Sequence, residues 1–384
     1  MRKRSLVDKR ILIPVLFVII CSVILTALNN YFAIRVRGIQ RQIVTNKEPL
    51  DFNKYLVIRR PKGGQNAALI YNKIFDVFKN NEAEFDMLFD IRYLDYEKLL
   101  KEKHEYCKSL VKRHAALFDM LYITSRMPYC NFNIDRVHDP CVALPHLGGI
   151  RKAVRFLTIK AMLERNDGKY RQAIGTFAEI LRISDSACND GYQESFEAAI
   201  YQNTRILKLI DSMIERDNLK QLDYKRILNM LAQEEQTNRK LYLETLYGMR
   251  CHYIALFENH FFKGWYVLVY TAGHGPVGIT DALLSRFVGS NIFRPFIRMD
   301  YFYTLQLESK FIDLVKLNGT DWSSNKQDEF FSKYAETSPF NGRVGTFYTR
   351  KYVIRDLRSI SANEMKYIAY LQSLKTKCLS NMEK

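Results

Sequence analysis

Residues that break helices are scarce in this sequence. Its 384 residues include only 9 Pro and 17 Gly. A many-turned β-sandwich needs more of both at its turns, whereas long helices tolerate neither in their interiors. Hydrophobic residues make up 47% of the chain and charged residues 26%, which excludes a disordered chain and a collagen-like repeat. The length is sufficient for one large or two medium domains with a real core.

The sequence also lacks the motifs that usually identify an enzyme. It has no CxxC pair, which excludes a zinc ribbon and a thioredoxin motif, and it has no GxSxG or P-loop segment. Residues 104–108 (HEYCK) resemble the zinc motif HExxH, but Lys108 stands where the second zinc ligand must lie. We therefore predict no catalytic residue and no cofactor.

One glycine-rich segment, residues 273–278 (GHGPVG), has the GxGxxG spacing of a dinucleotide-binding loop. It follows a strand-like run at residues 265–270, but no second strand or crossover comes after it, and Pro276 lies inside the loop. We interpret this segment as a glycine turn.

The chain has a single long hydrophobic run near its N-terminus. No charged residue occurs from Ile11 to Ile34, and about 20 apolar residues in a helix span the hydrocarbon core of a bilayer. A cleaved signal peptide is the main alternative, but no small-x-small cleavage site follows the run. We predict a short basic tail at residues 1–10 and an uncleaved transmembrane anchor at residues 11–34, which contacts membrane lipid.

The net charge of +17 is concentrated around this run. Nine basic residues and one acidic residue precede Glu48, so much of the excess positive charge flanks the membrane. Five of the basic residues lie before the run and four after it. This small difference favours a cytoplasmic tail and a cell-membrane protein whose bulk is extracytoplasmic, in the periplasm.

After a juxtamembrane linker at residues 35–64, the apolar residues recur with a helical period. Residues 96–121 read as one long helix, and residues 150–161, 170–181 and 196–213 as three more. Gly168 and Gly191 end helices, because glycine adopts the left-handed conformation of a C-cap. The sequence predicts a mostly α protein in which one N-terminal transmembrane helix precedes stacked antiparallel helical hairpins, as a TPR-like α-solenoid or an irregular bundle.

The predicted hairpin domain covers residues 65–250. Its residues Gly168, Tyr170, Ala173 and Phe177 resemble the helix-turn packing of a tetratricopeptide repeat, although the characteristic Trp and final Pro are missing. An aromatic, glycine-containing apolar segment follows at residues 251–300; we interpret it as buried chain, with a membrane-interface segment as the alternative. Residues 301–384 form a basic, helical C-terminal region, whose arginines interleaved with aromatic residues leave nucleic acid as a less favoured partner.

The chain resembles a family of uncharacterised membrane-anchored, tetratricopeptide-like helical proteins of planctomycetes and related bacteria. The resemblance covers roughly residues 65–215. It rests on residues 65–71 (QNAALIY), 130–132 (CNF), 144–147 (LPHL) and the glycine-turn-alanine pattern between Ile150 and Ala173. Many members continue into a Gly- and Pro-rich C-terminal segment, which is not found here after Lys384. The resemblance implies an anchor and a helical body, and it implies no activity.

Two sets of residues could form a small site. Cys130 and Cys141 are the closest cysteine pair in the sequence and could form a disulfide, although small buried core residues are the commoner fate of such cysteines. His138, Cys141 and His146 could converge on a metal ion, although capping and packing are the default roles of such residues.

The predicted function is therefore recognition. We expect a single-pass, membrane-anchored helical-repeat protein that acts as a protein–protein interaction or scaffolding module at the bacterial cell envelope, since solenoid surfaces bind peptides and other domains. The alternatives are an envelope enzyme with an unrecognised, metal-dependent site at His138, Cys141 and His146, and a cytoplasm-facing nucleic-acid-binding protein.

Overall fold

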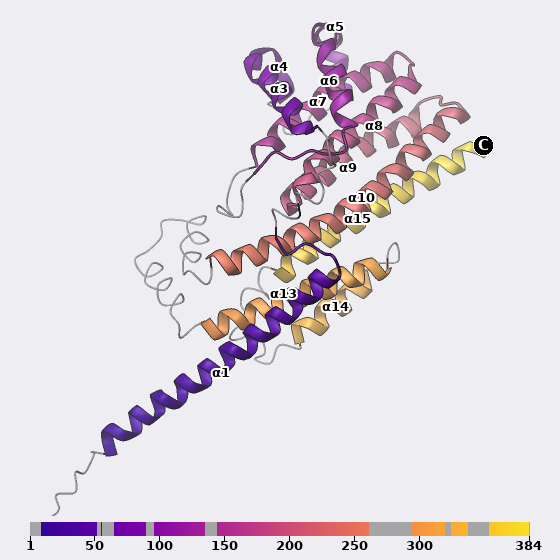
Figure 1. Ribbon diagram of the computed structural model, residues 1–384. Coiled ribbons are helices and arrows are strands. Elements are labelled where there is room, and N and C mark those ends of the chain that lie inside the picture. Colours follow the sequence, from indigo (N-terminus) through magenta and orange to yellow (C-terminus); the bar gives the residue numbers. More distant parts are fainter. Residues whose placement is uncertain are drawn as a thin grey trace, which may run out of the picture. The chain divides into compact units, whose positions relative to one another are not determined.

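The computed structural model describes residues 9–51, 55, 65–89, 96–134, 144–260, 294–318, 324–336 and 353–383. Within these ranges the regular structure is helical throughout (Figure 1), which confirms the predicted mostly α fold. The chain divides into two compact units. One consists of Met1–Phe52, Arg250–Leu317 and Asn325–Leu357, and the other of Asn53–Met249, Asn318–Ser324 and Arg358–Lys384.

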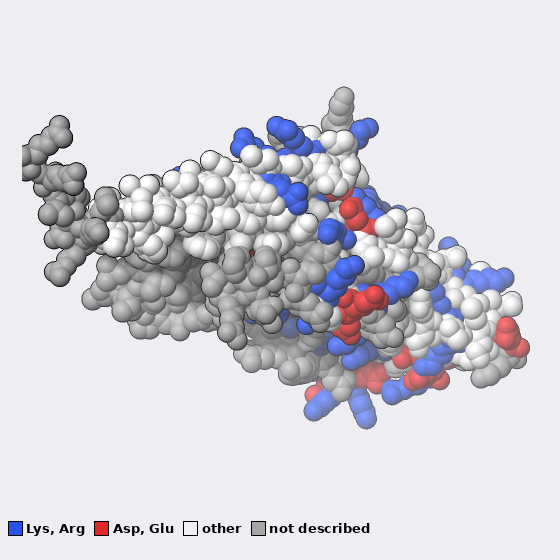
Figure 2. Space-filling view, turned by 90° about the horizontal axis from the view of Figure 1, so that it is seen from below, with Lys and Arg blue, Asp and Glu red and all other residues white. Residues whose placement is uncertain are grey.

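The first unit begins with α1 (Lys9–Thr45), a continuous helix of 37 residues. Its stretch Ile13–Leu28 is apolar and mostly exposed, and its most apolar window has a mean hydropathy of 2.2 with none of its residues buried. In the described part of the chain, α1 is the one helix long and apolar enough to cross a membrane. This exposed stretch is white throughout in Figure 2, without Lys, Arg, Asp or Glu.

Helix α1 does not end at Ile34 but continues to Thr45, so residues 35–45 of the predicted linker are helical. This second half packs on α13 (Arg294–Asn318), which lies beside it in Figure 1. The rings of Phe32 and Phe302 have centroids 5.9 Å apart, and the Gln40 amide donates hydrogen bonds to Glu258 (2.8 Å) and to the Tyr301 hydroxyl (3.1 Å). Because one face of residues 32–45 is buried in this way, α1 continues beyond the apolar run.

Apolar stacking and a buried ion pair complete the first unit. The Phe311 ring packs against Phe331 of α14 (Ser324–Glu336), with centroids 5.4 Å apart. The guanidinium of Arg250, whose side chain is fully buried, donates a hydrogen bond to Glu48 (2.7 Å), which also binds Lys316. A buried guanidinium keeps its charge, so it needs such a carboxylate.

The second unit contains the eight described α-helices between residues 67 and 255, or most of their length. These are α3 (Ala67–Asn80), α4 (Glu82–Phe89), α5 (Tyr96–Arg113), α6 (Ala115–Ser125), α7 (Pro145–Asn166), α8 (Tyr170–Ser186), α9 (Gln193–Arg216) and α10 (Gln221–Ala255). The 3-10 turn η1 (Ala187–Asp190) joins α8 to α9, and the unit also holds most of α15 (Ile354–Met382). The π-helical turn η2 (Leu256–His260) extends α10 within the first unit.

The single helix predicted for residues 96–121 is wrong, because the chain forms two helices there, α5 and α6, with a break at His114. The imidazole of His114 lies 2.9 Å from Glu84 and packs against Phe85, with ring centroids 4.7 Å apart. The break allows α5 to pack on α7 while α6 packs on α3 and α8. Because both helices bury an apolar face, the helical period of apolar residues in the sequence continues across the break. The period therefore does not reveal where one helix ends and the next begins.

The α7–α8 hairpin forms where the sequence predicts it. Gly168 has a φ of +71° and ends α7 in the left-handed conformation. Ala173 and Phe177 on α8 are fully buried, and α7 and α8 pack along their length. A small residue at position 173 permits this close approach, because it adds little volume between the helices.

A second glycine contact fixes helix α10. Gly191, with a φ of +72°, follows η1, and Gly248 of α10 lies directly against it. A Cβ atom built on Gly248 would be 2.0 Å from the carbonyl oxygen of Gly191. Only glycine fits there, since backbone cannot move aside as a flexible side chain can.

Helix α15 docks on the second unit through a buried polar network, and it lies beside α10 in Figure 1. The Asn203 amide donates hydrogen bonds to Asp185 (2.8 Å) and Glu234 (3.1 Å), and the Tyr367 hydroxyl donates one to Glu234 (2.5 Å). Burial raises the pKa of both carboxyls. Burial also raises the pKa of Glu364 to about 7, helped by Glu235 and opposed by Arg239.

We expect Gly248→Ala to destabilise the protein by roughly 2 kcal/mol, because the backbone must shift and the gain in helix propensity offsets only part of that cost. The matched control is Gly175→Ala on α8, where a Cβ meets nothing within 4 Å; it should stabilise the helix by about 0.5–1 kcal/mol. Denaturant unfolding of the full chain in detergent measures both. Equal effects of the two substitutions would contradict the close approach.

We expect Glu364→Gln to change how stability depends on pH. The folded-state pKa of about 7 exceeds the ordinary value of 4.5, so the folded protein binds more protons between these values and the wild type loses stability as pH rises through them. Between pH 4.5 and pH 8, the free energy of unfolding of the variant should therefore rise relative to that of the wild type by up to about 3 kcal/mol. Unfolding curves at several pH values measure the difference, and the exposed Glu105→Gln should show none of it.

Candidate functional site

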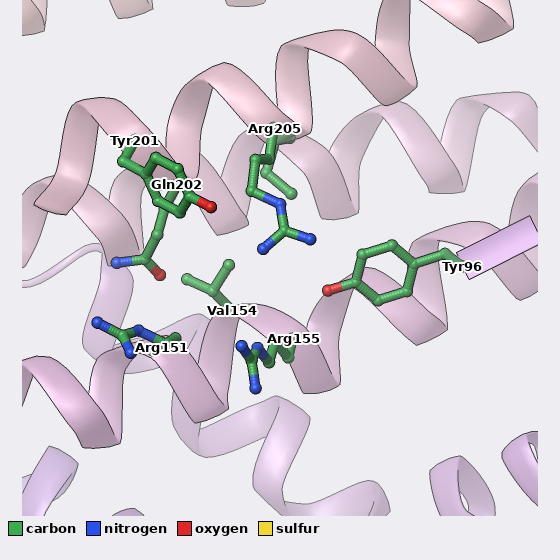
Figure 3. Close-up of a pocket in the computed structure, with 8 residues that line it drawn as sticks. Tyr96, Arg151, Val154, Arg155, Tyr201, Gln202 and Arg205 are labelled. Carbon is green, nitrogen blue, oxygen red and sulfur yellow. The ribbon is translucent and has the colours of Figure 1, made fainter. Parts of the chain in front are cut away.

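A cavity of about 290 Å³ lies between α5, α7 and α9 in the second unit. Three arginines line it, together with two tyrosines, a glutamine and two aliphatic residues. The lining consists of Tyr96, Arg151, Val154, Arg155, Tyr201, Gln202, Arg205 and Ile206. Figure 3 shows the Arg205 guanidinium and the Tyr96 hydroxyl pointing into the same space, with Arg151 and Arg155 on the facing helix.

Helical spacing places these side chains. Arg151 and Arg155 are four residues apart on α7, and Tyr201 and Arg205 are four residues apart on α9, so each pair lies on one face of its helix. Because α7 and α9 pack against each other, the two pairs face a common space. Tyr96, the first residue of α5, closes the space on a third side.

The electrostatics of the cavity are unbalanced. None of its eight lining residues is acidic, and neither Arg151 nor Arg205 forms an ion pair with a carboxylate in the described part of the chain. Burial lowers the pKa of Arg155, and the positive charges of Arg151 and Arg205 lower it further, against the opposing effect of Tyr96 and Tyr201. Three guanidinium groups thus raise one another's energy in a space partly shielded from water.

The two tyrosines add neutral, directional groups. Burial raises the pKa of Tyr96, against the opposing effects of Arg205, of a hydrogen bond with Thr158 and of Arg155, so its hydroxyl stays protonated at neutral pH. The Arg205 guanidinium lies 5.9 Å from the centroid of the Tyr201 ring, within the range of a cation–π interaction. The lining therefore combines charged donors with an aromatic wall.

This set of groups suits recognition of an anion. Guanidinium groups bind carboxylates and phosphates through paired hydrogen bonds. The lining residues include no His, Cys, Ser, Asp or Glu, the residue types that usually act as a nucleophile, a general base or a metal ligand. The cavity can therefore hold and orient a negatively charged group.

A second cavity, of about 480 Å³, is lined by residues that include Arg182, Asp185, Lys240 and Glu244. Its charges are of both signs. Asp185 belongs to the buried network with Asn203 and Glu234, so its carboxyl is already engaged in holding helices together.

The sequence-predicted metal and disulfide residues are described only in part. His138 and Cys141 lie outside the described residues, so the structure tests neither the metal site nor the disulfide. His146 is buried at the start of α7, where its ring stacks on Phe132 with centroids 4.4 Å apart and its Nε2 lies 3.3 Å from Asp190 without hydrogen-bond geometry. Cys130 is buried as well, and burial raises the pKa of its thiol well above the usual range.

The other predicted features have mixed outcomes. In the described part of the chain no group of three or more His, Cys, Asp or Glu side chains could hold a metal ion. The glycine segment 273–278 and the apolar segment 261–280 lie outside the described residues. Gly168, Tyr170, Ala173 and Phe177 do belong to the α7–α8 hairpin.

The arginine-lined cavity was not predicted from the sequence. Its signal was the repeated four-residue spacing of Arg151 with Arg155 and of Tyr201 with Arg205. Tyr96 begins the helix predicted for residues 96–121, and its side chain is buried.

Protein-family models, curated proteins and solved structures contain no match to this chain.

We expect sulfate and phosphate to raise the unfolding temperature of the full chain more than chloride does at equal ionic strength. A ligand that binds only the folded state stabilises it by about 1.4 kcal/mol at ten times its Kd. The variant Arg151→Gln/Arg205→Gln should lose this difference. The control Arg171→Gln, an exposed position outside the lining, should keep it, since any general salt effect acts on both variants alike. An anion effect of equal size in both variants would exclude the cavity as its source.

Proposed function

We propose that this chain is a single-pass, membrane-anchored helical-repeat protein that binds an acidic segment of a protein partner at the cell envelope. The observation that carries the proposal is the cavity between α5, α7 and α9, which three arginines line and whose lining contains no carboxylate. An acidic side chain or a chain-terminal carboxylate of a partner would supply the missing negative charge.

The architecture supports a recognition role. We propose that α7 and α8, with Gly168 at their turn and Ala173 between them, form a tetratricopeptide-like hairpin, and that α9 and α10 form the next one. Successive hairpins of this kind expose equivalent helices on one face. Arg151 and Arg155 on α7 and Arg205 on α9 would then lie on the face available to a partner. The resemblance to the planctomycete family of anchored helical proteins accords with this arrangement.

The anchor supports the location. The exposed apolar stretch of α1 is unfavourable in water and favourable in hydrocarbon. We propose that it spans the cell membrane with the helical body on the periplasmic side, because the five basic residues before the run exceed the four after it. The anchor would confine partner binding to the membrane surface and raise the effective concentration of a partner held there.

The lining chemistry favours binding over the alternative of an envelope enzyme. Its lining contains no His, Cys, Ser, Asp or Glu, and its three arginines are groups that bind anions. His146, the described member of the proposed metal set, is buried against Phe132 and beside Asp190, an environment that a packing role accounts for.

The proposal is tested by peptide binding to the full chain in nanodiscs. The probe is a fluorescent pool of ten-residue peptides that contain two adjacent Glu residues, and its matched control replaces both with Gln. We expect the acidic pool to bind in a salt-dependent manner and the Gln pool to bind at least ten-fold more weakly, since each charged hydrogen bond contributes about 1.5–3 kcal/mol. Arg151→Gln/Arg205→Gln should lose the preference, and Arg171→Gln should keep it.

Three results would overturn the proposal. Equal binding of the two pools would exclude an acidic partner. An unchanged preference in the double variant would exclude the cavity as the binding site. Tighter binding of a single-stranded oligonucleotide than of the acidic pool would favour nucleic acid. A photo-crosslinking version of the pool, added to intact spheroplasts, tests the orientation, because labelling only after lysis would place the body in the cytoplasm.

A further inference from the structure

The protein body covers one face of the anchor helix beyond Leu28. Tyr31, Ile34 and Val44 stay exposed there, and most apolar side chains are exposed from Ile13 to Leu28. At the next residue the guanidinium of Arg298 donates a hydrogen bond to the carbonyl oxygen of Asn29 (3.3 Å), and Phe32 is buried against α13. The apolar run up to this level, Ile11–Leu28, is about 27 Å long as a helix, close to the thickness of a hydrocarbon core.

Four arginines from two helices gather just beyond this level. Arg35 and Arg37 belong to α1, and Arg294 and Arg298 belong to α13; we call them the juxtamembrane arginine cluster. The Arg35 guanidinium lies 5.2 Å from the centroid of the Phe302 ring. Burial lowers the pKa of Arg298, and the charges of Arg294 and Arg37 lower it further. The contact of Arg35 with Phe302 and the charge effects of Arg294 and Arg37 on Arg298 show that the four guanidinium groups lie close together.

In the described part of the chain, Arg35, Arg37 and Arg294 form no ion pair with a carboxylate. No acidic residue occurs in the sequence between Asp8 and Glu48, so α1 itself supplies no carboxylate. On the other helix Asp300 is buried. Arg35, Arg37 and Arg294 are exposed and Arg298 is half-buried, so the guanidinium groups are accessible to a ligand from solvent or from the bilayer.

We propose that the juxtamembrane arginine cluster binds the phosphate groups of anionic phospholipids. This inference rests on the membrane anchor of the proposed function, and it is independent of the partner that the arginine-lined cavity binds. Arg35 is about 10 Å along the helix from Leu28, a separation that brings it to the headgroup region. Guanidinium groups bind phosphate through paired hydrogen bonds, and an anionic headgroup relieves the repulsion among the four cations.

The test is lipid enrichment around the full chain. The protein is reconstituted in nanodiscs of phosphatidylcholine with 10 mol% phosphatidylglycerol, and native mass spectrometry measures the lipids that stay bound after release. We expect phosphatidylglycerol to be enriched several-fold over its bulk share, because each basic residue near the surface corresponds to about a five-fold preference. Arg35→Gln/Arg37→Gln, at two exposed positions, should bring the ratio close to the bulk value.

A matched control separates the cluster from net charge. Arg171→Gln/Lys225→Gln removes two exposed charges elsewhere and should leave the enrichment unchanged. Equal enrichment in the wild type and in Arg35→Gln/Arg37→Gln would overturn the inference while leaving the anchor intact. Loss of enrichment on addition of 10 mM inorganic phosphate would identify free phosphate, and not lipid, as the ligand. Failure of the wild type to enter nanodiscs would instead overturn the anchor of the proposed function.

Discussion

The burial of helix α7 is the constraint on which the second unit depends. It packs against α3, α4, α5, α8 and α9, and from Ala153 to Ile159 every side chain is buried. A helix enclosed on so many sides must place its charged residues in the few directions left open. Arg151 and Arg155 occupy one such direction, toward α9. The arginine-lined cavity follows from the way α7 is enclosed.

The sequence predicted what depends on local structure. Gly168 marks a helix end because few other residues adopt its left-handed conformation, and Ala173 marks a close helix contact. The apolar run of α1 was equally visible, because the length and composition of a membrane helix are properties of one segment. These features need no knowledge of where the rest of the chain lies.

The remaining features depend on partners far away in the sequence. A helical period reports that one face is buried and does not report what covers it. The period therefore ran across the break at His114, and it gave no sign that Tyr367 would contact Glu234 across 133 positions. The arginine pairs on α7 and α9 were visible as spacings, but their convergence needs α8 to set the two helices side by side. The extension of α1 to Thr45 needed α13 in the same way.

The second unit buries groups of both signs, and only the acidic ones can lose their charge by a change of protonation. Asp185 and Glu234 can take up protons when buried, and their pKa values are raised accordingly. With Asn203 and Tyr367 as hydrogen-bond partners they form a buried polar network that holds helices together.

A buried arginine cannot lose its charge in this way, because a guanidinium does not lose its proton in a protein. A counter-ion reduces the repulsion among Arg151, Arg155 and Arg205, and the lining of their cavity contains no carboxylate. The relief must therefore come from outside the lining, as solvent ions or as a bound anionic group. A bound group gains more from the site than a mobile ion does, because Tyr96 and Gln202 add hydrogen-bonding groups at fixed positions. Arg155 is buried, whereas Arg151 is exposed and Arg205 half-buried, so an anionic group from solvent can reach this cluster.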